Sequence, residues 1–170
     1  MQEKQPSAIN GQAPSPRPEY EILTQFIKDL SFESPSTPQI FFEKNPPQQQ
    51  PSLNVNLEVK TQKVGEELYE VIINVKVNNT VDNRTLFVVD LSYGAVVAIH
   101  SNDEEKIKNY ITQTTPAFVF PFIREIIASL TRESGFAPFV LAPIDFSRVA
   151  FQQTSGPSIG SAPAGPASNA

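Results

Sequence analysis

The sequence contains no cysteine and a single histidine, His100. The absence of cysteine excludes disulfides, thiolate catalysis and cysteine-based zinc sites. One histidine argues against a histidine-clustered metal site and against a serine–histidine triad. An excess of basic residues is also missing. The formal net charge is −5, whereas a general nucleic-acid binder needs a basic face to meet phosphates, so no nucleic-acid partner is expected.

Long apolar runs are missing as well. No stretch approaches the roughly 18 to 20 consecutive apolar residues of a membrane-spanning helix, so no membrane insertion is expected. Residues 1–18 lack the apolar segment of a secretory signal, which favours a cytoplasmic protein. These residues are polar and carry four prolines, and residues 154–170 carry no charge. We therefore expect disordered tails at 1–18 and 154–170 around one domain, residues 19–153.

One long amphipathic helix is predicted around residues 118–130, FVFPFIREIIASL. Its apolar residues recur at helical spacing and predict one broad stripe made of Phe118, Phe122, Ile123, Ile126, Ile127 and Leu130. Pro121 suits the first helical turn. Gly135 follows the last turn, where a left-handed residue often ends a helix. We expect this stripe to be shared between the core and a subunit interface.

Two shorter helices are predicted on either side of the long one. The first begins at Ser101, with Glu104 at the spacing of a capping box. We expect residues 114–116, Thr-Thr-Pro, to end it. The second is a short final helix capped by Asp145 and reaching as far as Phe151.

Apolar and polar residues alternate in four segments, residues 19–33, 52–61, 68–78 and 84–99, which predicts strands. The expected buried face of the first strand consists of Tyr20, Ile22, Thr24, Phe26, Lys28, Leu30 and Phe32. The fourth segment is apolar on both faces, so we expect it to meet another subunit or an added element. The pattern predicts an antiparallel sheet with one solvated face.

The loop at residues 33–51 is too rich in proline for a helix or a central strand. It nevertheless carries Ile40, Phe41 and Phe42 in its middle. Two interpretations remain open. The three side chains either pin a crossover loop to the core or line an opening.

Two surfaces stand out in the predicted fold. The polar face of the sheet collects Glu21, Asp29, Glu33, Glu58, Glu70 and Asp90 against Lys60 and Lys76. It is either a solvated face or a docking face for a basic partner. The apolar residues of the 33–51 loop, Tyr69 and the run at 136–146 exceed what one helix over a small sheet needs, which is typical of an oligomer interface or a binding groove. No nucleophile, base and oxyanion site come together, so neither an enzyme nor a cofactor is expected.

Four segments in this order resemble the SecB protein-export chaperone family: KDLSFESPSTPQIFF, LYEVIINVKV, FPFIREIIASL and GFAPFVLAPIDF. The resemblance covers residues 20–153. It implies an α+β fold, a four-stranded antiparallel sheet with one long and two shorter helices packed on one side, assembled as a homotetramer (a dimer of dimers). It also implies an ATP-independent chaperone without enzymatic activity. Such a chaperone binds unfolded preproteins in apolar surface grooves, keeps them translocation-competent and delivers them to the translocation ATPase SecA.

The resemblance also implies roles for individual residues. Matching positions for SecA docking are Asp29, Glu33, Val88 and Asp90. Candidates for the client-binding groove are Ile40, Phe41, Phe42, Tyr69, Phe136 and Phe139, and candidates for the oligomer interface are Val96, Phe122 and Ile126. The chain departs from the family at residues 44–46, Lys-Asn-Pro, where the family often has a tryptophan, and in its uncharged tail. The alternative function is a carrier of a small lipid or hydrophobic ligand between sheet and helix.

Overall fold

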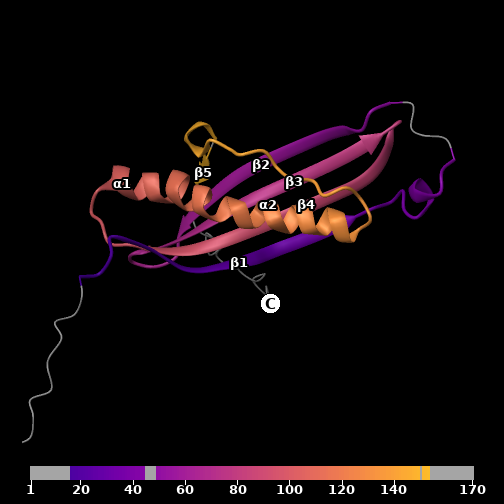
Figure 1. Cartoon of the computed structure of the whole chain (residues 1–170). Coiled ribbons are helices and arrows are strands. Elements are labelled where there is room, and N and C mark those ends of the chain that lie inside the picture. Colours follow the sequence, from indigo (N-terminus) through magenta and orange to yellow (C-terminus); the bar gives the residue numbers. More distant parts are fainter. Residues whose placement is uncertain (1–15, 45–48, 150, 154–170) are drawn as a thin grey trace, which may run out of the picture.

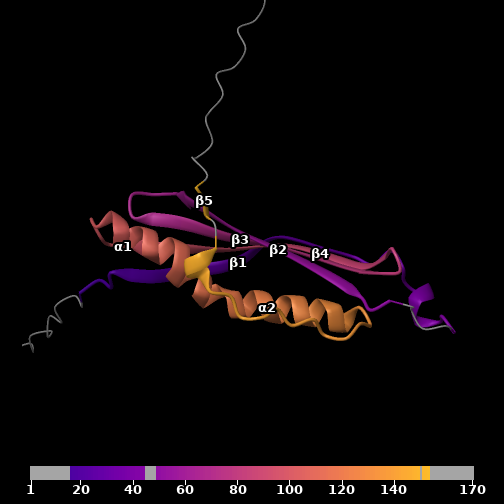
Figure 2. The same cartoon turned by 90° about the horizontal axis from the view of Figure 1, so that it is seen from above.

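The structure, a computed structural model, describes residues 16–44, 49–149 and 151–153. A long helical segment crosses one face of an elongated, twisted sheet (Figures 1 and 2). None of the described helices is long and apolar enough to cross a membrane. Residues 1–15 and 154–170, which make up nearly all of the two predicted tails, lie outside the described residues, so those tails stay predictions.

The sheet has the strand order β1-β4-β3-β2-β5. Its long strands are β1 (Tyr20–Glu33), β2 (Ser52–Lys63), β3 (Leu68–Val81) and β4 (Arg84–Ile99). They pair antiparallel throughout, which confirms the predicted four-stranded antiparallel sheet. A short fifth strand, β5 (Phe151–Gln153), pairs parallel with β2.

Strand β4 lies in the middle of the sheet, between β1 and β3. This position accounts for much of the apolar character of both faces, and the predicted contact with another subunit or an added element stays a prediction. Leu91, Ala95 and Val97 are fully buried on the face under the helix. On the other face Gly94 is covered by the ring of Phe26, which a Cβ at position 94 would approach to 2.7 Å. Around residues 91–97, β4 is thus covered by the helix on one side and by Phe26 on the other.

Two β-bulges change the faces predicted for β1. The register against β4 shifts between Ile22 and Thr24 and again between Ile27 and Asp29. Each shift reverses the alternation of side chains. Thr24 and Phe26 therefore lie on the face without the helix, paired with Val96 and Gly94, so their predicted burial under the helix was wrong. Lys28 also reaches that face, where it bonds Glu70. The prediction is confirmed for Tyr20, Ile22, Leu30 and Phe32, which pack against the core.

The helical segment begins at Glu104, three residues after the predicted start at Ser101, and is not interrupted. It consists of α1 (Glu104–Asn109), a π-helical turn η2 (Tyr110–Thr114) and α2 (Thr115–Glu133). Pro116 does not stop it, because it falls in the first turn of α2, where a missing N–H leaves no bond unmade. Pro121 lies inside α2 and not in its first turn. The N-terminal cap is Asp103, whose carboxylate accepts from the amides of Glu105 and Lys106, so the predicted cap at Ser101 was wrong.

Gly135 ends α2 as predicted. It has φ +86°, and the amides of Gly135 and Phe136 donate to the carbonyls of Arg132 and Thr131 at 3.1 Å each. These two bonds form a Schellman motif, which satisfies carbonyls at the helix end. An extended segment, residues 136–146, then runs back along α2 (Figure 1). We call this segment the connector.

The final helix was predicted too long. Asp145 does act as a cap, accepting from the amide of Ser147 at 3.0 Å. The helix it begins is a single 3₁₀ turn, η3 (Phe146–Arg148). The chain then becomes extended, and Phe151 starts β5 where we had expected helix. Pairing with the open edge of β2 replaces the helical continuation.

The core fills the layer between the sheet and α2. From the helix, Val119, Ile123 and Ile127 are fully buried, with Phe120 beside them. Part of the predicted apolar stripe does not face the core, because Phe118 and Phe122 are 56 % and 46 % exposed. They occupy the neighbouring stripe of α2, which nothing in the described chain covers. The stripe of α2 that packs against the sheet is thus narrower than the whole apolar stripe of the helix. That the exposed part forms a subunit interface stays a prediction.

Candidate functional site

The four residues predicted to dock SecA lie together on the face of the sheet without the helix, which we call the open face. Glu33 of β1 pairs with Val88 of β4, and Asp29 pairs with Ser92, two residues from Asp90. Cross-strand partners share a face, so all four side chains emerge on the same side. The four positions were taken from the resemblance, and the second bulge of β1 keeps Asp29 and Glu33 on the same face as Val88 and Asp90. Their docking role stays a prediction.

Lysines neutralise part of the acidic charge on the open face. The ion pairs are Lys28–Glu70 at 2.9 Å, Lys60–Glu58 at 3.0 Å and Lys76–Asp90 at 3.4 Å. The hydrogen bond from Lys60 holds the pKa of Glu58 below its usual value. Among the described residues, Asp29 and Glu33 make no ion pair. The unneutralised negative charge is therefore concentrated along β1.

Glu70 is the one buried carboxylate of the open face, only 8 % exposed. Lys28, the residue left over by the second bulge of β1, reaches it across β4. We expect Lys28→Met to lower the free energy of unfolding by about 1–3 kcal/mol, because a buried charged group would lose its partner. Urea denaturation measures the loss. Adding Glu70→Gln should recover part of it, and equal stabilities for the wild type and Lys28→Met would contradict this role for the pair.

An aromatic cluster closes the other face of the sheet at the end of α2. Phe32 of β1 stacks on Phe87 of β4 with ring centroids 5.9 Å apart. Phe136 of the connector lies 5.2 Å from Phe87 and 5.3 Å from Phe41 of the 33–51 loop. Gly135 leaves room for this packing, since a Cβ there would lie 3.0 Å from the ring of Phe41. The predicted groove residues Phe41 and Phe136 are thus in direct contact.

The loop at 33–51 satisfies both interpretations in part. Ile40 packs against the core and Phe41 against the aromatic cluster, which pins the loop. An ion pair between Glu43 and Arg84 also ties it to β4. Phe42, in contrast, is 77 % exposed. Phe41 also remains 47 % exposed despite this packing, so both Phe41 and Phe42 can present aromatic surface to a partner.

An apolar strip on β2 was missed by the sequence analysis. Leu53 and Val55 lie on the helix side of the sheet, paired with Asn79 and Val77, yet both are exposed. On the same face of the same strand Val59 is fully buried. The connector and α2 cross the sheet without covering the first half of β2 (Figure 1). Alternation identified which face these side chains take, but it carries no signal for where the covering helix lies.

Tyr69 and Phe139 lie apart from the aromatic cluster. Tyr69 lines a hollow of about 650 Å³ with Ile107 and Ile111, and Lys63 Nζ lies 5.8 Å from its ring centroid. It starts β3, whereas Asn79 near the other end pairs with Phe87. That separation is roughly 30 Å at the usual rise of a strand. Phe139 lies on the connector, packed against the core. The candidate groove residues therefore follow a line along the sheet and do not form one pocket.

The three predicted interface residues do not share a surface. Phe122 is on the outward side of α2, next to exposed Phe118, whereas Ile126 is partly buried and packs against the core. Val96 is on the open face, between Thr24 of β1 and Glu70 of β3. The interface role stays a prediction for each of them. On geometry, Phe118 is a better companion for Phe122 and Ile126 than Val96 is.

Candidate sites for chemistry are sparse in the described chain. Within those residues, no cluster of three or more histidine, aspartate or glutamate side chains is placed to hold a metal. His100 bonds Glu67 at 2.7 Å, at the junction between β4 and the helical segment. This contact joins the end of β4 to the turn before β3. Among the described residues, neither side chain makes a further ion pair. The distinctive features of the described chain are the two faces of its sheet, the acidic open face and the apolar helix side.

Comparison with known proteins identifies the family of this chain. The sequence profile of the family described as "Preprotein translocase subunit SecB" matches residues 13–156. The chain belongs to the SecB family. Its relatives include the protein-export protein SecB of Zymomonas mobilis, 36% identical over 137 residues, which is 81% of each chain. That of Rhodopseudomonas palustris is 38% identical over 129 residues, 76% of this chain and 80% of the relative.

A solved structure supports the SecB fold as well. The Mycobacterium tuberculosis SecB-like chaperone, determined with a ChAD peptide from an antitoxin, is similar with a TM-score of 0.59. The similarity covers 74% of this chain and 91% of that chain at 16% identity, so it speaks for the fold alone. SecB proteins are non-enzymatic chaperones for protein export.

Proposed function

We propose that this SecB protein is an ATP-independent chaperone of the cytoplasm. It binds unfolded preproteins on the helix side of its sheet, keeps them translocation-competent and delivers them to SecA through the open face. The observation that carries this proposal is the separation of the two surfaces. Exposed apolar side chains gather on one side of the sheet, at Leu53, Val55, Phe42 and Val140. Unneutralised acids lie on the other side.

The client groove follows the line from the aromatic cluster to Tyr69, with β2 as its floor and the connector as its wall. Burial of hydrocarbon is non-directional and contributes roughly 25 cal/mol per Å² of apolar area. Such a surface therefore binds many sequences. An unfolded client supplies apolar side chains along its length, whereas a folded protein presents few. Because ordering a flexible client offsets much of the gain, release needs no nucleotide.

The open face supplies a docking surface of different chemistry. Asp29 and Glu33 project from β1 without ion-pair partners among the described residues, and Val88 adds an apolar contact beside them. Complementary charge speeds encounter and selects the partner. A basic element of SecA fits this surface. The same charge would repel an acidic one.

We further propose that the chain assembles as a dimer of dimers. The outward stripe of α2, formed by Phe118 and Phe122, is apolar and exposed in a single chain, and Ile126 borders it, partly buried against the core. An apolar stripe of this kind is typical of a subunit interface. In the SecB fold it is the helix side that has such a surplus, so the assembly joins helix sides and leaves the open faces outward.

The proposal predicts that the purified protein suppresses aggregation of a chemically denatured client at a stoichiometric ratio without ATP. Light scattering of the diluted client measures this. Native mass spectrometry with and without the client should show a tetramer that gains the mass of one client. A folded form of the same client is the control and should neither bind nor be retained. A protein that stays monomeric and protects no client would contradict the proposal.

The structure does not support the alternative function, a carrier of a small lipid or hydrophobic ligand. The layer between sheet and α2 is filled by fully buried side chains such as Ile73, Ile123 and Ile127, so it favours no enclosed lipid. An antitoxin peptide is bound by the Mycobacterium tuberculosis SecB-like chaperone, which is only 16% identical. The relatives at 36% and 38% identity are protein-export proteins, and they favour export clients for this chain.

A further inference from the structure

Two side chains of α2 hold the connector in place. The backbone amide of Phe139 donates to Thr131 Oγ1 at 2.9 Å. Arg124 lies seven residues before Thr131, about two helical turns closer to the start of α2. Its Nε donates to the carbonyl oxygen of Leu141 at 2.8 Å. Between these anchors, the backbone of Val140 makes no hydrogen bond to the described residues. The connector is therefore attached to the helix by side chains and not by a strand ladder.

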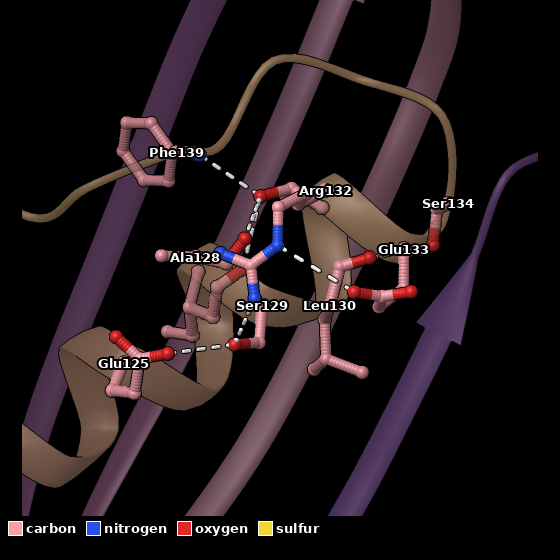
Figure 3. Close-up of polar contacts among 10 residues, drawn as sticks. Glu125, Ala128, Ser129, Leu130, Arg132, Glu133, Ser134 and Phe139 are labelled. Atoms are coloured by element: carbon pink, nitrogen blue, oxygen red, sulfur yellow. Dashed lines mark hydrogen bonds and ion pairs between the residues drawn. The ribbon is translucent and has the colours of Figure 1, made fainter.

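Thr131 is placed to serve the connector and not only its own helix. It is fully buried, and its hydroxyl donates to the carbonyls of Ile127 and Ala128 at 3.0 Å each. Threonine commonly donates to the preceding turn in this way. The donation turns a lone pair of Oγ1 outward, where it meets the amide of Phe139 (Figure 3). One hydroxyl thus joins two elements, and within the described part of the chain the amide of Phe139 has no other hydrogen-bond partner.

The two anchors fix which side chains of the connector face outward. Leu141 is buried and Phe139 is partly buried against the core, whereas Val140 between them is 55 % exposed. In an extended segment, successive side chains point to opposite sides. A slip by one residue would turn Val140 inward and expose Leu141. The register of the connector on α2 therefore determines the apolar surface that forms the wall of the groove.

We propose that Thr131 and Arg124 are positioning residues for client binding. They hold the connector in the register that presents Val140 to the client and keeps Phe139 and Leu141 in the core. This inference rests on the proposed function and names the residues that keep the wall of the client groove in place. Neither side chain needs to touch the client, since both act through the backbone of the connector.

The test replaces the hydroxyl of Thr131 and keeps its shape. In Thr131→Val the amide of Phe139 loses its acceptor, and the connector should hold its register in only a fraction of molecules. Apparent affinity falls in proportion to that fraction, so we expect binding of a fluorescently labelled unfolded client to weaken roughly tenfold. Amide exchange at Phe139 should lose its protection. Thr131→Ser keeps the hydroxyl and should bind within about twofold of the wild type.

Matched controls separate positioning from general loss of structure. Arg124→Met removes the second anchor and tests the proposal independently if Thr131→Val does not fold. Arg132→Gln is the control, because Arg132 contacts Ser129 and Glu133 on the exposed side of the same helix and not the connector (Figure 3). We expect Arg132→Gln to bind clients normally, and all variants to keep their oligomeric mass and their affinity for SecA.

Three results would overturn parts of this picture, and they are distinguishable. Unchanged client affinity in Thr131→Val, despite lost protection of the Phe139 amide, would overturn the positioning role. Equal weakening in Thr131→Ser and Thr131→Val would assign the effect to packing and not to the hydroxyl, which would also overturn it. A wild-type protein that binds no unfolded client would instead refute the proposed function and leave the anchoring of the connector untouched.

Discussion

Reversing two acids of the open face, Asp29→Lys with Asp90→Lys, is expected to weaken binding of SecA by about a hundredfold at low salt while client binding is unchanged. Asp29 has no ion-pair partner among the described residues. Asp90 lies 3.4 Å from Lys76, so its replacement also leaves that lysine facing a like charge. The loss should shrink at high salt, because screening weakens attraction and repulsion alike. Isothermal titration calorimetry with purified SecA measures the change.

A control with the same change in net charge isolates the location of the effect. Glu105→Lys with Glu133→Lys reverses two exposed acids near the two ends of the helical segment, away from the open face. This variant should bind SecA within a few-fold of the wild type. An Asp29→Lys, Asp90→Lys protein that binds SecA with unchanged affinity would show that the docking residues are misassigned.

Placing charge on the apolar strip of β2, with Leu53→Asp and Val55→Asp, should abolish most client binding. Both side chains are exposed in the folded chain, so folding itself should tolerate the change. A client would have to bury two carboxylates where it now buries hydrocarbon. We expect affinity for an unfolded client to fall by about thirtyfold or more, since each buried aliphatic side chain contributes roughly 1.5 kcal/mol or more. Fluorescence anisotropy of a labelled client measures the loss.

The strand itself offers the matched control. Asn54 and Asn56 alternate with Leu53 and Val55 and therefore face the open side of the sheet. Asn54→Asp with Asn56→Asp adds the same two charges to the same strand on its opposite face. This variant should bind clients normally. If both variants weakened client binding equally, charge on β2 in general, and not the apolar strip, would be the cause.

The sequence predicted most reliably where one local rule applied alone. Strict alternation in β2 and β3 was sufficient to assign both strands and the face of each side chain. Gly135 was identified as the end of α2 because only a left-handed residue fits there. In each case neighbours in the chain determine the outcome.

Predictions failed where tertiary contacts decide. Each bulge of β1 inserts one extra residue, and the residue types at these positions do not predict a bulge. Phe26 was therefore assigned to the wrong face. Pro116 was expected to stop a helix, but a π-helical turn before it lets the helical segment continue. The exposure of Leu53 depends on the path of the connector, which lies more than eighty residues further along the chain. Local patterns do not contain this information.

A sheet with different chemistry on its two faces has a consequence for how a client is passed on. Under the proposed function, only the thickness of one sheet layer would separate a client on the helix side from SecA on the open face, so both would fit on the chaperone together. SecA then gains access to the client as a tethered reactant, at an effective concentration on the order of millimolar. Transfer in such a ternary complex is governed by proximity and not by competition, and a client with slow release is still handed over efficiently.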